Sequence, residues 1–159
     1  TDPLDSAKQL RSVMQLNLEA AIEINRAFIP HMQERGWGRI CHISSVSATE
    51  NQGHPFYCAS KAALNAYVRS VGRYVAKENI IMTSLMPGPI YAEGGYWDIC
   101  KEERPKHYQK FIQERMAIQR IGKPTEIAEL CLVLCSQMAS FCVGTTLMVD
   151  GGQGRSFNY

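Results

Sequence analysis

Apolar residues recur along the chain in two different patterns, which predict helices and strands in succession. The segment from about Phe56 to Ala76 carries apolar residues three and four positions apart, as an amphipathic helix does. The segment from Leu10 to Met32 also has a helical pattern, but it is apolar on more than one side, so we expect it to pack on both a sheet and a neighbour. Three short, mostly apolar runs, at residues 38–45, 80–86 and 145–149, are typical of strands that helices cover on both faces. The pattern predicts an α/β fold with a doubly wound parallel sheet.

Two polar residues of the helix predicted over 56–76 are candidates for proton transfer. Tyr57 and Lys61 are four residues apart, so both side chains lie on the same helix face. A free tyrosine titrates near pH ~10, a cation beside it favours the phenolate, and a general acid or base works best near the working pH. A tyrosine and a lysine at this spacing also occur by chance in many helices.

Two hydroxyl groups end the strand predicted over 38–45. Ser44 and Ser45 are followed by a polar turn that leads into the Tyr57 helix. Ligands of open α/β sheets bind at the carboxyl ends of the strands. The serines are therefore expected close to the start of the Tyr57 helix.

With these residues the sequence resembles the short-chain dehydrogenase/reductase family, in its single-domain branch. The resemblance covers nearly all of the chain and is carried by Asn17 in Leu16-Asn17-Leu18, Ile43-Ser44-Ser45, Tyr57-x-x-x-Lys61, Pro87-Gly88 and Val149-Asp150-Gly151-Gly152. It implies an NAD(P)-dependent oxidoreductase that interconverts a carbonyl and an alcohol by hydride transfer. The implied partner is a small carbonyl or alcohol substrate.

The resemblance also implies roles for four catalytic residues. Tyr57 donates or accepts the proton, and Ser45 hydrogen-bonds the substrate oxygen. Lys61 favours the phenolate and holds the nicotinamide ribose, while Asn17 distorts its helix and anchors a water that passes protons to the lysine. Counting back thirteen residues from Tyr57 gives Ser44 instead, but the strand end and the spacing from Asn17 favour Ser45.

Besides Tyr57 and Lys61, the resemblance assigns Pro87, Gly88 and Ile90 to the cofactor site, where their loop lines the nicotinamide. Ala92 stands near the place of a usual threonine, and Thr83 takes the place of a usual asparagine. NAD and NADP are not distinguished, because the discriminating residues follow a strand that this chain lacks.

Residues 91–122 combine flexible glycines with large aromatics, which suits a lid over a substrate cleft. A surface helix pair packed on the core is the competing interpretation. Tyr91 and Trp97 of this segment are predicted to contact substrate, with Ser47 and His54 from the turn before Tyr57. His54 also fits an ordinary surface turn.

The glycine-rich turn that opens a nucleotide-binding fold is absent from the sequence, which contains no GxGxxG pattern. Residues 1–159 are therefore expected to form the C-terminal part of a single Rossmann-like domain whose N-terminal nucleotide-binding half is missing. Strand 38–45 would then leave an open edge, which a longer polypeptide or a partner covers.

A scaffold or interaction subunit without cofactor binding is an alternative function. A sugar-nucleotide epimerase or dehydratase shares the Tyr–Lys pair, but the Val149–Gly152 ending fits it less well.

Composition narrows the class of protein further. A net charge of +2 and a pI near 8.2 give no reason to expect nucleic-acid binding, and the sequence shows no signal peptide and no apolar run of the ~18 residues that span a membrane. The six cysteines lack CxxC spacing, so we predict buried free thiols, no metal site and a reducing cytoplasm.

The resemblance implies a homodimer or homotetramer through the Asn17 and Tyr57 helices. Asp5 or Ser6 is expected to cap the first helix, and Phe157 and Tyr159 to reach a neighbouring subunit.

Overall fold

A parallel sheet of three strands forms the centre of the computed structural model, which describes residues 7–155. Strands β1 (Gly38–Ile43), β2 (Ile80–Pro87) and β3 (Thr146–Val149) lie in the order β1-β2-β3. Gly38 pairs with Ile80 at one end of β1, and Ser84 pairs with Thr146 where β3 begins. Every residue of β2 except the last is buried, as expected of a central strand, whereas β1 has no second neighbour among the described residues.

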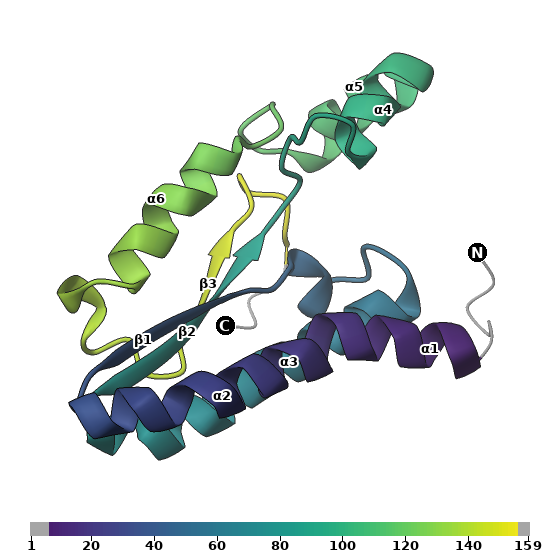
Figure 1. The fold of residues 1–159 in the computed structure, drawn as a ribbon. Coiled ribbons are helices and arrows are strands. Elements are labelled where there is room, and N and C mark those ends of the chain that lie inside the picture. The colour runs from purple at the N-terminus through teal and green to yellow at the C-terminus, as the bar shows by residue number, and fades with distance from the viewer. Residues whose placement is uncertain (1–6, 156–159) are drawn as a thin grey trace.

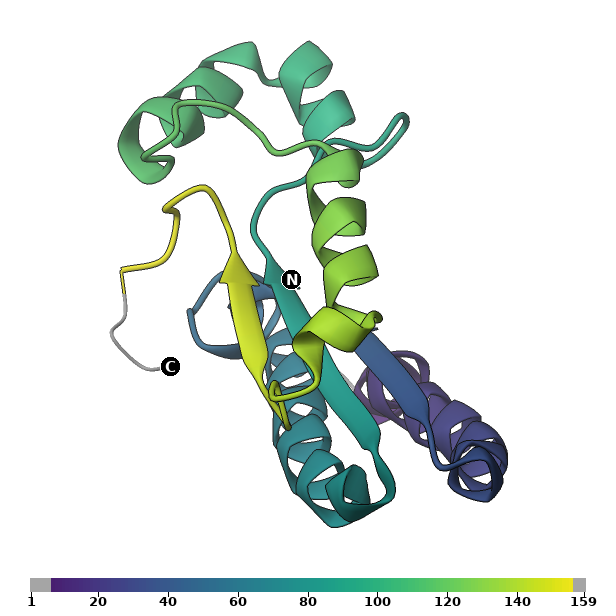
Figure 2. The same cartoon turned by 90° about the vertical axis from the view of Figure 1, so that its left-hand side faces the viewer.

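One face of the sheet is covered by the helices that precede and follow β1 (Figures 1 and 2). These are α2 (Ala20–Arg35) and α3 (Pro55–Val75), whereas α1 (Ala7–Met14) contacts α3 and extends past the sheet. Leu64 and Val68 of α3 pack on Met82 of β2, with apolar residues of α2 around them. A fully buried leucine such as Leu64 is worth about 2–5 kcal/mol relative to alanine, so this layer is a main source of stability.

The opposite face is covered by α6 (Pro124–Leu134) (Figure 2). Leu85 points to this side of β2 and packs with Leu134 and Ala139. Because Met82 and Leu85 of one strand belong to opposite cores, helices lie on both faces of the sheet. This is the doubly wound arrangement that the sequence predicted.

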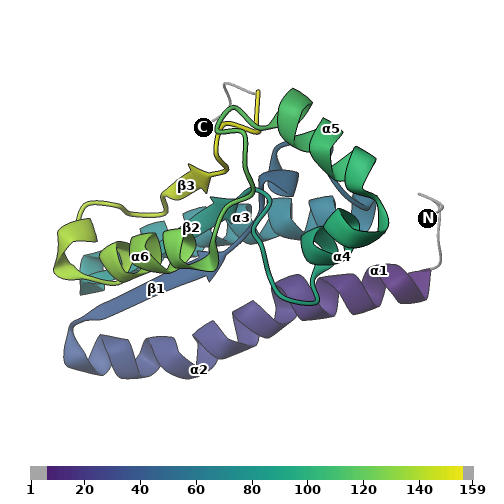
Figure 3. The same cartoon turned by 90° about the horizontal axis from the view of Figure 1, so that it is seen from above.

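Two further helices, α4 (Tyr96–Glu103) and α5 (Pro105–Arg115), lie beyond the carboxyl ends of the strands (Figures 1 and 3). Short 3-10 segments occupy Val46–Ala48, Ala76–Glu78 and Gln137–Ala139. The segment 91–122 is thus a helix pair at the edge where ligands of such sheets bind. Its closure over a substrate stays a prediction.

The three predicted strands and the predicted Tyr57 helix agree with the structure to within about two residues at their ends, whereas the helix predicted over Leu10–Met32 runs from Ala7 to Arg35 and is interrupted. Gly36 ends α2 in the left-handed conformation with φ of 62°, which a residue with a side chain adopts only at a cost. All six cysteines are free as predicted, but only Cys100 is buried, and the other five are half-buried. The expected cap at Asp5 or Ser6 and the contacts of Phe157 and Tyr159 fall on residues that the structure does not describe.

Candidate active site

Two adjacent cavities open at the carboxyl ends of β1 and β2, and Tyr57 lies between them. Ser45, Tyr57, Gly88 and Trp97 line both cavities. The first, of about 540 Å³, extends between the 46–53 turn and the α4–α5 pair. The second, of about 460 Å³, extends toward Ile90 and the start of α6. We call them the outer cavity and the loop cavity.

The Tyr57–Lys61 pair lies on one face of α3, as its spacing predicted. The Lys61 ammonium is 5.6 Å from the centre of the Tyr57 ring. It donates a hydrogen bond of 3.0 Å to the carbonyl of Ile43, the last residue of β1. Burial lowers the pKa of Lys61 from its usual value. An ammonium has three donors, so two remain for ligands.

The structure distinguishes the two candidate serines. The Ser44 hydroxyl is buried and donates to the Lys61 carbonyl at 3.4 Å. The Ser45 oxygen accepts a hydrogen bond of 3.1 Å from the Ser47 amide, and its O–H has no acceptor among the described residues. Ser45 therefore presents a free donor to both cavities, and the geometry favours it over Ser44.

Asn17 lies in a π-helical stretch, Gln15–Glu19, between α1 and α2. Its side-chain amide donates to the Val13 carbonyl at 3.0 Å. Insertions of this type are rare and are frequent at functional sites. This stretch contacts α3, the helix of Tyr57 and Lys61, so the predicted distortion of the helix is present, and the water relay stays a prediction.

The loop after β2 has features that fit a nicotinamide group. Gly88 packs so tightly on the β3 end that an added Cβ would lie 2.8 Å from the Asp150 Cα. Hydrogen bonds join Gly122 to Pro89 and Tyr91, the neighbours of Ile90. The amide of Ile90 consequently has no acceptor among the described residues, and Ile90 lines the loop cavity. A free amide beside an apolar wall suits a carboxamide.

The predicted substrate residues do not all come together. Ser47 and Trp97 line the outer cavity. His54 instead caps α3 through its Nδ1 atom, which accepts from the Phe56 amide, and Tyr91 lines a separate cavity beside α5. Other residues of the outer cavity were not predicted from the sequence, and among them Gln52, His107, Phe111 and Gln153 come from three distant segments.

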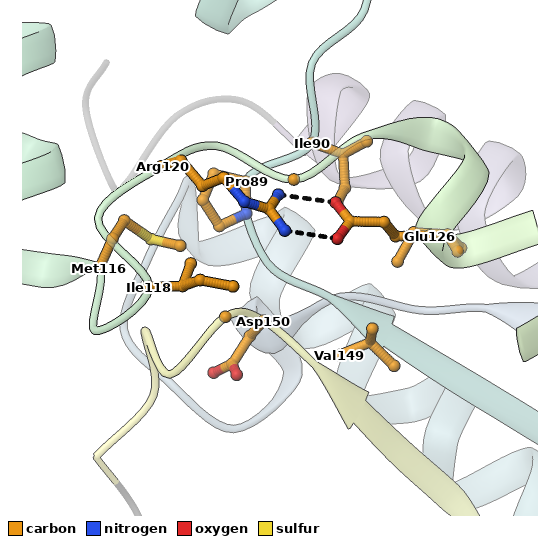
Figure 4. Close-up of a pocket in the computed structure, with 11 residues that line it drawn as sticks. Pro89, Ile90, Met116, Ile118, Arg120, Glu126, Val149 and Asp150 are labelled. Carbon is orange, nitrogen blue, oxygen red and sulfur yellow. Dashed lines mark hydrogen bonds and ion pairs between the residues drawn. The ribbon is translucent and has the colours of Figure 1, made fainter.

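A third, smaller cavity of about 160 Å³ lies behind the loop of Ile90 (Figure 4). Arg120 and Glu126 form two hydrogen bonds of 2.8 and 2.6 Å at its wall. The Arg120 guanidinium and the Lys123 amide lower the pKa of Glu126 to about 2. This ion pair fixes the start of α6 against the loop cavity.

Comparisons with known proteins show to which family the chain is similar. A family model described as enoyl-(acyl carrier protein) reductase matches residues 4–153. The 3-oxoacyl-(acyl-carrier-protein) reductase FabG of Aquifex aeolicus is 31% identical over 141 residues, covering 88% of this chain and 54% of the relative. Dehydrogenase/reductase SDR family member 4 of Mus musculus is 33% identical and covers 88% of the chain and 49% of the relative. The chain spans about half the length of the curated relatives it matches.

Solved structures show the same fold. L-sorbose reductase from Gluconobacter frateurii, complexed with NADPH and L-sorbose, superposes with a TM-score of 0.89 at 28% identity and covers 99% of this chain and 62% of that chain. A 3-oxoacyl-(acyl-carrier-protein) reductase from Agrobacterium tumefaciens with NADP bound gives a TM-score of 0.88 at 25% identity, over 96% of this chain and 58% of that chain. No helix of residues 7–155 is long and apolar enough to cross a membrane.

Proposed function

The chain belongs to the short-chain dehydrogenase/reductase family, and on this premise we propose that it carries the catalytic half of an NAD(P)-dependent oxidoreductase. The reaction interconverts a carbonyl and an alcohol. Similar proteins that are named reductases, or were solved with NADP or NADPH, support this class of reaction. The proposed catalytic residues are Asn17, Ser45, Tyr57 and Lys61.

One observation carries the proposal: Tyr57 lines both cavities together with Ser45, whose hydroxyl donor is free among the described residues. The loop cavity contains the proposed cofactor residues Pro87, Gly88 and Ile90. The outer cavity contains the proposed substrate residues Ser47 and Trp97. A reacting carbonyl placed between the cavities would meet Tyr57 and Ser45 together.

In the direction of reduction, the Tyr57 hydroxyl gives its proton to the carbonyl oxygen. The free O–H of Ser45 donates a hydrogen bond to the same oxygen and stabilises the negative charge that develops on it. The Lys61 ammonium then stabilises the phenolate that remains on Tyr57. Asn17, in the distorted part of its helix, would anchor a water that passes protons to Lys61.

The cofactor, NAD or NADP, would supply the hydride for this reduction in its reduced form, NADH or NADPH. Ile90 would hold the carboxamide through its free amide, and Lys61 would bind ribose hydroxyls through its two remaining donors. Trp97 and Pro87 would exclude water from the loop cavity.

Tyr57→Phe in the intact protein tests this function. We expect the rate of NADH or NADPH oxidation with a ketone substrate to fall by about 10²–10⁴-fold, because the proton donor is removed. Tyr74→Phe is the matched control, since Tyr74 lies on the same helix with Lys77 at 5.4 Å from its ring but is exposed. Activity of Tyr57→Phe within tenfold of the wild type would end the assignment.

Fluorescence titration with NADH and NADPH separates this enzyme from the alternative of a scaffold subunit without cofactor binding. We expect clear binding to the intact protein and weak or no binding to residues 1–159 alone. The six free cysteines favour a reducing cytoplasm as the compartment. We further propose that the protein is a homodimer or homotetramer.

A further inference from the structure

Two glutamine side chains form part of the wall of the outer cavity. Gln52 lies in the turn between β1 and α3, and Gln153 follows β3. Gln153 is only 4% exposed. Its Nε2 amide donates a hydrogen bond to Oε1 of Gln52. The two amides therefore form one unit, made from segments a hundred residues apart.

Each amide keeps one buried atom without a partner among the described residues. These atoms are Nε2 of Gln52, a donor, and Oε1 of Gln153, an acceptor. If the oxygen and nitrogen positions are exchanged in both side-chain amides, the hydrogen bond between them reverses its direction. One donor and one acceptor still remain without a partner. Buried amide atoms without partners are destabilising, so a ligand that pairs with both gains affinity.

The backbone on both sides holds this amide pair in place. The Ser47 hydroxyl donates to the backbone carbonyl of Gln52, and the backbone amide of Gln52 donates to the backbone carbonyl of Glu50 at 2.8 Å. Asp150 accepts from the amides of Gly152 and Gly154, the residues that flank Gln153, at 3.0 and 2.6 Å. The pair is thus organised before a ligand arrives, which lowers the entropic cost of binding.

Aromatic side chains of the α4–α5 helix pair line the same cavity. The rings of Trp97 and Phe111 are 4.3 Å apart, and Trp97 also borders Tyr57 in both cavities. A pair of amides with one free donor and one free acceptor can bind a hydroxyl group, because a hydroxyl both donates and accepts a hydrogen bond. The faces of the aromatic rings can pack on the C–H groups of a polyol. An unsubstituted hydrocarbon chain would leave both amide atoms unpaired.

We infer that Gln52 and Gln153 bind a hydroxyl group of the substrate close to its reacting carbonyl, and that the substrate is a hydroxylated, sugar-like ketone or aldehyde. The inference rests on the proposed function, because it assigns the substrate class of the same site. A site built to bind a hydroxyl discriminates strongly against the analogue that lacks it.

The test compares two probes that differ by one hydroxyl, 1-hydroxy-2-butanone and 2-butanone, with the intact protein and NADPH or NADH. We expect the wild type to prefer the hydroxylated probe in kcat/KM. Gln153→Leu should lower kcat/KM for that probe by about tenfold to hundredfold and leave 2-butanone within about twofold. Gln137→Leu, the same change at an exposed residue far from the cavity, should change neither value.

Equal losses on both probes in Gln153→Leu, or no preference in the wild type, would overturn the inference. Failure of the proposed function gives a different result. Tyr57→Phe would then keep its activity, whatever the ratio of kcat/KM between the two probes. If neither probe is turned over, saturation-transfer NMR measures their binding to the intact protein. Binding of 1-hydroxy-2-butanone that Gln153→Leu abolishes supports the inference, and binding that is absent or unchanged contradicts it.

Discussion

Lys61 is held by contacts that leave its charge available to Tyr57. The carbonyl of Ile43 fixes the ammonium at the end of β1. Burial lowers the pKa of Lys61, and burial together with the charge of Lys61 lowers the pKa of His42 on β1. His42 accepts a hydrogen bond from Asn25, which fits its neutral form. His42 therefore adds no second positive charge beside the ammonium.

Lys61→Met is expected to lower activity and to move its pH dependence. Alcohol oxidation needs the phenolate of Tyr57, which a cation favours, so the rising limb of the pH–rate profile should shift to higher pH. We expect kcat/KM for oxidation at pH 7 to fall by about 10²-fold or more.

A second measurement on Lys61→Met does not depend on activity. Without the lysine charge, the pKa of His42 should rise when it is followed by NMR titration. Lys77→Met, at the exposed Tyr74–Lys77 pair, should change neither the rate profile nor His42. An unchanged pH profile in Lys61→Met would contradict the assigned role.

The sequence predicted those site residues that local spacing determines. Tyr57 and Lys61 share a helix face because they are four residues apart, and Ser45 closely follows a strand whose apolar pattern is clear. Gln52 and Gln153 were not predictable, because they meet only through the folding of two loops that are distant in sequence. His54 shows the reverse case: its type suggested a ligand contact, but its ring caps a helix.

At the level of elements, the helix over 7–35 shows what periodicity cannot predict. Its apolar pattern gave a single helix with Asn17 in the middle, whereas the structure inserts a π-helical stretch over Gln15–Glu19. One extra residue in a turn rotates the side chains that follow by about 100°. Because this helix is apolar on more than one side, its pattern does not reveal such a shift, and the distortion was implied only by the family resemblance. The role of Asn17 in proton transfer stays a prediction.

The start of α6 gives a pH-dependent prediction. Glu126 pairs with Arg120 and accepts from the Lys123 amide at 2.8 Å, and its pKa falls to about 2 from 4.5. A carboxyl whose pKa is lowered in the folded state stabilises above its unfolded pKa, and this contribution is lost as the pH falls from about 4.5 to about 2.

Glu126→Gln should therefore lower Tm at pH 7, and its difference from the wild type should shrink as the pH approaches 2. Thermal unfolding followed by circular dichroism at pH 7, 4 and 2.5 measures this trend. Glu114→Gln removes a more exposed ion pair, Lys110–Glu114 at 3.9 Å, and is expected to leave Tm nearly unchanged at each pH. A Tm difference for Glu126→Gln that is constant across this range would exclude the ion pair as its cause.

At the scale of the whole molecule, the described chain leaves apolar surface exposed on the side of α2. Leu16, Ile24 and Phe28 are 76%, 59% and 57% exposed, and Ile24 and Phe28 are one helical turn apart. Several large apolar side chains exposed along one helix suit a protein interface better than solvent. The two-sided apolar pattern of this helix in the sequence has the same explanation, since one side packs on the sheet and the other stays uncovered.

Phe28→Glu tests whether this surface joins subunits. In a symmetric dimer the same patch occurs on both subunits, so one substitution places two charges in the interface. We expect light scattering after size-exclusion chromatography to give a dimer or tetramer for the intact wild type and a smaller species for Phe28→Glu. Phe141→Glu is the matched control, because Phe141 is 99% exposed and lies near the opposite face of the sheet, after α6. A monomeric wild type, or equal masses for both variants, would show that the α2 surface does not hold subunits together.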